Sequence, residues 1–274
     1  MQLDFAGRLA LADGRYLARS DGEASEVLVV SALGAPPRRR WRRARAVPVE
    51  PEPDPEPLPL TRVTVVTPDD LGAAADAAGW LERVADSDVA EAFVAQALGL
   101  LNRALHAHAT AAQDPYVNEL SASGAAALRI GYGEGEQVAE GTWSDARELH
   151  AREPRRRRID ALQPTERVAA VLGEREQIAP SESLLLRARL DLDQGREREA
   201  ALQLRAGLEA LLAETAAGES PGPREDEGAL RERVPDVAAV AAAASGGELD
   251  AEARATVEDT LAECLRALRR RRAL

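Results

Sequence analysis

Short hydrophobic runs of β type occupy the N-terminal part of the chain and predict a small sheet. Residues 7–12 and 15–20 flank Asp13-Gly14, a dipeptide that supplies the positive φ angles of a tight hairpin turn. Residues 26–32 and 61–67 are rich in β-branched side chains and predict a third and a fourth strand. We expect these strands to form one small antiparallel sheet, with its apolar face covered by the helices that follow.

Residues 36–60 interrupt this predicted sheet with a segment that cannot join a hydrophobic core. Its first part is rich in arginine, and residues 50–57 alternate an acidic residue with a proline. Proline removes a backbone donor and holds φ near the polyproline II value, so the acidic part should be extended and solvated. Because predicted strands flank the segment, residues 26–32 and 61–67 should pair or lie adjacent, with a disordered loop between them.

From residue 68 onward, the hydrophobic spacing changes to that of helices. Pro68-Asp69-Asp70 suits a helix N-terminus, where unpaired N–H groups favour negative charge. Helices are predicted over residues 71–85 and 89–112, and the apolar stripe of the second lies on one face because its members recur every three or four residues. That stripe consists of Leu98, Leu101, Leu105, His108 and Ala112. An alternating run over residues 126–132 is a candidate fifth strand.

The chain beyond residue 153 is predicted to be helical. Pro164 opens a short helix, residues 181–193 and 196–215 form a helical hairpin, and two further helices cover 229–244 and 250–272. Residues 217–228 are polar, contain Gly and Pro, and predict a flexible loop. The predicted organisation is a small β-sheet region at 1–67, a helical region at 68–153 and a C-terminal helical domain at 154–274. The expected fold class is α+β and predominantly α-helical.

The helical hairpin resembles one tetratricopeptide unit. Gly195 stands at the turn, Ala200 at the close contact between the helices, and Leu204, Leu208 and Leu211 continue an apolar stripe. Tetratricopeptide arrays need at least about three stacked units to bury a continuous core, and the sequence has no second copy at that period. We therefore favour an ordinary antiparallel helix pair packed on its neighbours, with a small groove for a partner peptide as the alternative.

Composition supports a helical core and limits the function. Apolar residues make up 45% of the chain and aromatic residues 3%, so the core must be built from Leu, Val and Ala. All 35 basic residues are arginine, which indicates a GC-rich bacterial genome and weakens arguments from arginine clusters. The net charge of −12 argues against binding nucleic acid or membrane over the whole surface. Without a signal peptide pattern or a long apolar run, we expect a soluble, cytoplasmic protein.

The glycine-rich run after the candidate fifth strand does not match a phosphate-binding motif. Its members are Gly131, Gly133 and Gly135. A dinucleotide fingerprint needs glycine where Glu136 stands, and a Walker loop needs a lysine, which this chain lacks. We interpret the three glycines as a tight, positive-φ connection between a strand and a helix.

The histidines and the single cysteine predict no metal, cofactor or catalytic site. His106 and His108 lie two residues apart on a predicted helix and therefore point to different faces. Cys264 belongs to the apolar stripe of the last helix and should pack as a small hydrophobic residue. One cysteine also excludes an internal disulfide framework.

The most specific binding feature of the sequence is the cationic arm around Trp41. An aromatic side chain among arginines on a flexible arm can stack on a base or enter a membrane interface. A solvated charge run is the simpler interpretation. The candidate anion-binding residues are Arg38, Arg39, Arg40, Trp41, Arg42, Arg43 and Arg45.

Three classes of function remain open. We expect a non-catalytic interaction or scaffold protein with an unidentified protein partner, because no catalytic motif is present. One alternative is a regulator that binds nucleic acid or an anionic membrane surface through residues 38–45. The second alternative is an enzyme with a site near residues 131–135, in a pocket that Tyr132, Trp143, Glu134 and a histidine would line.

Overall fold

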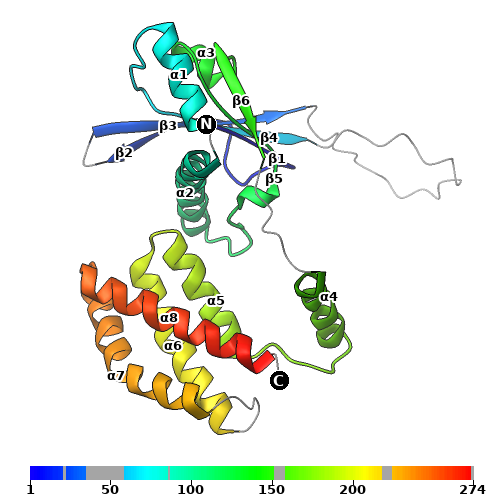
Figure 1. Ribbon diagram of the computed structural model, residues 1–274, viewed down its shortest axis with the longest axis vertical. Coiled ribbons are helices and arrows are strands. Elements are labelled where there is room, and N and C mark those ends of the chain that lie inside the picture. Colours follow the sequence, from blue (N-terminus) through cyan, green and yellow to red (C-terminus); the bar gives the residue numbers. More distant parts are fainter. Residues whose placement is uncertain (21–22, 35–58, 86, 151–157, 218–223, 273–274) are drawn as a thin grey trace, which may run out of the picture. The chain divides into compact units, whose positions relative to one another are not determined.

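The structure is a computed structural model that describes residues 1–20, 23–34, 59–85, 87–150, 158–217 and 224–272. The chain divides into two compact units, Met1–Pro154 and Arg155–Leu274. The first is built on an antiparallel sheet with helices, and the second is helical (Figure 1). The expected α+β, predominantly helical class is confirmed. Of the segment predicted to be disordered at 36–60, all but the last two residues lie outside the described residues.

The sheet has six strands in the spatial order β2-β3-β4-β1-β5-β6, and every neighbouring pair is antiparallel. Strands that are distant in sequence therefore lie side by side, as β1 does with β4 and β5. The strands are β1 (Gln2–Ala6), β2 (Gly14–Ser20), β3 (Glu23–Leu33), β4 (Leu60–Val66), β5 (Ala125–Tyr132) and β6 (Asp145–Leu149).

The two strands on either side of the proline-rich segment are direct neighbours. β4 pairs with β3 along the whole length of β4, from Val66 opposite Val27 to Leu60 opposite Leu33. The prediction that residues 26–32 and 61–67 lie adjacent is thereby confirmed. The candidate fifth strand is confirmed as well, because β5 pairs with β1 on one side and with β6 on the other.

The predicted first hairpin is wrong. Residues 7–12 form no strand, and the first strand is β1, which lies in the middle of the sheet between β4 and β5. Gly7 ends β1 with φ 86°, and its amide donates to the Pro59 carbonyl at 2.7 Å. The apolar residues Leu9 and Leu11 then contribute to the core from a loop. Asp13-Gly14 leads into β2, whose partner is β3.

One face of the sheet carries the hydrophobic core of the first unit. Leu3, Val63 and Leu128 lie side by side on β1, β4 and β5 and are all buried. They pack in one cluster with α2 (Ser87–Ala112), while α1 (Ala74–Val84) adds a smaller cluster around Ile130. Leu98, Leu101 and Leu105 of α2 are buried, as their spacing predicted, whereas His108 is half-buried and Ala112 exposed.

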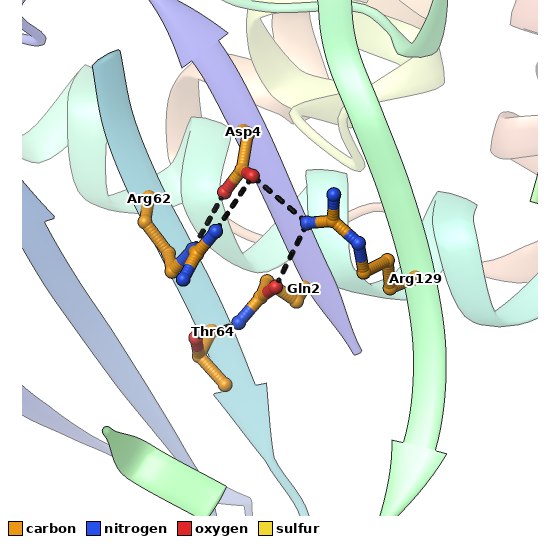
Figure 2. Close-up of polar contacts among 5 residues, drawn as sticks. All are labelled: Gln2, Asp4, Arg62, Thr64 and Arg129. Atoms are coloured by element: carbon orange, nitrogen blue, oxygen red, sulfur yellow. Dashed lines mark hydrogen bonds and ion pairs between the residues drawn. The ribbon is translucent and has the colours of Figure 1, made fainter. Parts of the chain in front are cut away.

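The opposite face of β1 carries a polar network (Figure 2). The Asp4 carboxylate accepts hydrogen bonds from Arg62 Nε at 2.8 Å and Nη2 at 2.9 Å, and from Arg129 Nη1 at 2.9 Å. Arg129 also donates to Gln2 Oε1 at 3.2 Å, and Gln2 Nε2 donates to Thr64 Oγ1 at 3.5 Å. Burial by itself raises the pKa of Asp4, but the hydrogen bonds and charges of the two arginines outweigh it and lower that pKa below 3.8.

The second unit is a bundle in which the predicted hairpin is confirmed as α5 and α6. Buried side chains from α5 to α8 form one cluster, and α8 contacts both helices of the hairpin. The chain's own last helix therefore covers part of the hairpin. Pro164, predicted to open a helix, lies inside α4 instead. The helices are α4 (Arg158–Leu172), α5 (Pro180–Asp193), α6 (Glu197–Ala216), α7 (Arg224–Gly246) and α8 (Ala251–Arg272).

Arginines near the C-terminus of α8 connect this helix to its neighbours. Arg270 Nη1 lies 2.6 Å from Asp226 Oδ1 in the first turn of α7. Arg271 donates to the Leu211 carbonyl and to the Thr215 hydroxyl on α6. Across the described parts of the chain, no helix combines the length and apolar character that crossing a membrane requires.

Candidate functional site

A cavity of about 510 Å³ lies in the first unit, at the edge of the sheet where β4 and β5 end. Because β1 and β3 run antiparallel to these two strands, their first halves lie at the same edge. The volume of the cavity falls within the range of about 300–1,000 Å³ that is typical of small-molecule sites. Residues from the ends of these strands, from α1 and α2, and from the segment after β5 line it.

Aromatic side chains form much of the cavity wall. Trp80 of α1, Phe93 of α2, Tyr132 of β5 and Trp143 all line it. The Trp80 and Phe93 rings meet edge to face, with centroids 6.1 Å apart. The chain has three Trp, three Tyr and two Phe in total, so four of its few aromatic residues gather at this one place.

The three glycines that the sequence singled out lie in the wall of this cavity. They carry the chain from β5 into α3 (Gly135–Ala139), which is the tight connection between a strand and a helix that we expected. Of the three, Gly135 alone has a positive φ, of 52°. At Gly133 the reason for glycine is close contact instead, because a Cβ there would lie 2.8 Å from Val138 Cγ2.

The polar groups of the cavity come from other parts of the chain. The register of β3 and β4 places Glu26 beside the end of β4, and Asp69 follows shortly after that strand. Glu26 Oε1 accepts a hydrogen bond of 2.8 Å from Gln96 Nε2 of α2. Trp143 Nε1 is buried and has no hydrogen-bond partner among the described residues.

Met1 also lines the cavity, and its amino group is buried. It donates to the Val65 carbonyl at 2.8 Å. Burial lowers the pKa of this amine from 8.0 to about 6, and the negative charge of Glu26 partly opposes that change. The protonated form of this amine is therefore destabilised by its loss of hydration.

The structure brings together only part of what the enzyme alternative requires. Tyr132 and Trp143 line the cavity, but Glu134 and the three histidines are not among its lining residues. The cavity is lined instead by the acidic residues Glu26 and Asp69, which sequence reasoning missed. Within the described ranges, no three His, Cys, Asp or Glu side chains come close enough together to hold a metal ion.

The candidate anion-binding residues of the arm, 38–45, lie outside the described residues. No protein-family model, no curated protein and no solved structure matches this chain.

Proposed function

We propose that the protein is a non-catalytic interaction protein whose first unit binds an apolar or aromatic group of its partner in the cavity. The observation that carries this proposal is the gathering of four aromatic side chains around a cavity of about 510 Å³. Burial of apolar surface contributes about 25 cal/mol per Å². Aromatic side chains supply this contact area at little cost in conformational entropy. The proposal includes a protein partner and a cytoplasmic location.

A second candidate is an enzyme that uses the same cavity. It is favoured by the position of Tyr132 and Trp143 beside the glycine-rich turn, where the sequence suggested a site. Glu26 is then the side chain to test as a general base, because it is a carboxylate residue that lines the cavity. Saturable turnover that is lost in Glu26→Gln would establish this second function in place of the first.

The neutral dye N-phenyl-1-naphthylamine, which fluoresces strongly in apolar surroundings, tests the proposed binding directly. We expect saturable binding of one dye per chain, with quenching of tryptophan fluorescence, because Trp80 and Trp143 line the cavity. Tyr132→Ala should weaken this binding by about fivefold or more, as expected for the loss of about 1 kcal/mol of aromatic contact.

Tyr116→Ala is the matched control, because the Tyr116 side chain is 85% exposed and does not line the cavity. It should leave dye affinity unchanged. Urea unfolding of both variants separates a loss of binding from a loss of fold. Absence of saturable binding, or equal weakening by the two tyrosine variants, would rule out the cavity as the binding site.

A further inference from the structure

Among the described residues, the charged side chains that line the cavity are Glu26 and Asp69, which are both negative, and no arginine or histidine is among them. All 35 basic residues of the chain are arginine, and none of the described ones lines this cavity. Among the described lining residues, an anionic ligand would meet two carboxylates, and the basic group beside them is the Met1 amine, whose pKa burial lowers to about 6.

The two carboxylates reach the same cavity because of the strand register. Val27 of β3 lies opposite Val66 of β4, so Glu26 lies next to the residue that follows β4. Asp69 comes two residues later and is exposed, whereas Glu26 is half-buried. Negative charge is thus concentrated where β3 begins and β4 ends.

The remaining walls offer aromatic and aliphatic surface. A cation within about 6 Å of an aromatic ring centroid gains roughly 0.5–2 kcal/mol from the electrons of the ring face, and most when water is excluded. Trp80, Tyr132 and Trp143 supply such rings, and Ile130 and Val138 supply aliphatic contacts. Aromatic rings combined with carboxylates recognise a positive charge that is attached to an apolar body.

We propose that the cavity selects an organic cation, namely a substituted ammonium group on an apolar body. This inference rests on the proposed binding function and specifies the ligand of the same site. A quaternary ammonium suits the cavity best, because it is weakly hydrated and loses little on leaving water, whereas a primary ammonium must give up strong hydrogen bonds to water.

Competition against N-phenyl-1-naphthylamine tests the preference for positive charge with three probes of similar size. Benzyltrimethylammonium carries the charge, neopentylbenzene is its neutral isostere, and benzenesulfonate is an anion. We expect the cation to bind about tenfold more tightly than the neutral isostere, which corresponds to about 1.4 kcal/mol. Benzenesulfonate should bind most weakly of the three.

Glu26→Gln should remove most of this preference, because the amide keeps an acceptor for Gln96 but carries no charge. Asp69→Asn is a second variant with the same expected direction. Glu82→Gln is the matched control, since Glu82 is exposed on α1 and does not line the cavity. It should leave the preference intact, which separates the cavity from the general attraction of a chain of net charge −12.

The source of the cation is resolved by a peptide that carries one trimethyllysine, measured beside free benzyltrimethylammonium. Tighter binding of the peptide assigns the cation to a side chain of a partner protein, and binding of the free ammonium alone assigns it to a small molecule.

If the dye binds but the neutral isostere competes as well as the cation, the inference of cation selectivity is overturned while the binding function stands. If the dye does not bind saturably, both fail.

Discussion

Gly133 approaches Val138 so closely that a Cβ at position 133 would lie 2.8 Å from Val138 Cγ2 and 3.2 Å from the Ser144 amide nitrogen. We therefore expect Gly133→Ala to displace the segment after β5, with a loss of about 1–3 kcal/mol in the free energy of unfolding. The same displacement should weaken dye binding, because Gly133 and Val138 both line the cavity. Urea unfolding and dye titration measure the two effects.

Gly99→Ala is the matched control for this substitution. Gly99 lies inside α2, and a Cβ there would meet nothing within 4 Å. Alanine should stabilise the helix by about 0.5–1 kcal/mol and leave dye binding unchanged. A Gly133→Ala protein as stable as Gly99→Ala would contradict the close packing of the turn.

Asp4→Asn should destabilise the first unit, because it leaves the guanidinium groups of Arg62 and Arg129 without their carboxylate. We expect a loss of about 1–3 kcal/mol at pH 7, since the Asp4 side chain is buried but both arginines are partly exposed. The pKa of Asp4 is lowered in the folded protein, so its stabilising effect is complete above the ordinary value of 3.8 and is lost as the pH falls below it.

The pH dependence of the free energy of unfolding tests the role of the Asp4 charge separately. Chemical unfolding at pH 7 and at pH 3 should show a difference between wild type and Asp4→Asn that shrinks on acidification. Asp13→Asn, at an exposed carboxylate, should be close to wild type at both pH values. A difference that grows as the pH falls would have the wrong sign for a carboxylate held ionised by arginines.

Cys264 should resist thiol reagents until the second unit unfolds. Its side chain is fully buried in the cluster of α5 to α8, which confirms that it packs as a small hydrophobic residue. Burial, assisted by the negative charge of Glu263, raises the pKa of the thiol to about 12. At pH 8 we expect reaction with a disulfide reagent about a thousandfold slower than that of a free thiol, with acceleration in urea. Fast reaction in the native protein would contradict this packing.

Residues 155–274 should fold as a separate fragment, because the described members of the buried cluster of the second unit all lie between residues 185 and 268. We expect a helical far-ultraviolet spectrum and cooperative unfolding. Within the fragment, Leu211→Ala should cost about 2–5 kcal/mol, since Leu211 is fully buried. Leu202→Ala on the same helix is the matched control, because Leu202 is 45% exposed and should cost under about 1 kcal/mol. A fragment without cooperative unfolding would show that its fold needs the first unit.

Strands with continuous β-branched runs were predictable, and strands built on polar contacts were not. β3 and β4 carry Val-rich runs, and β-branched residues such as valine are enriched in strands. β1 alternates Leu3 and Phe5 with the polar residues Gln2 and Asp4, which become buried because distant strands supply their partners. β6 (Asp145–Leu149) is mostly polar and lies at the edge of the sheet, so its sequence carries little apolar alternation.

The candidate site was predictable only where its residues are close in sequence. The glycine-rich turn with Tyr132 and Trp143 could be recognised as one place on the chain. The other half of the site comes from Glu26, Asp69 and the helices α1 and α2, whose meeting depends on strand register and helix packing. Neither property is visible in a single segment of sequence.

The indole N–H signals of the three tryptophans test the central claim most directly. Trp80 and Trp143 line the cavity, whereas Trp41 belongs to the cationic arm outside the described residues. In a two-dimensional ¹H–¹⁵N spectrum, with signals assigned by single Trp→Phe variants, benzyltrimethylammonium and the neutral ligand 1-naphthalenemethanol are titrated separately. We predict saturable shifts of the Trp80 and Trp143 signals and none of the Trp41 signal. Shifts confined to Trp41, or no saturable shift at Trp80 and Trp143 with either ligand, would contradict a binding site in the cavity.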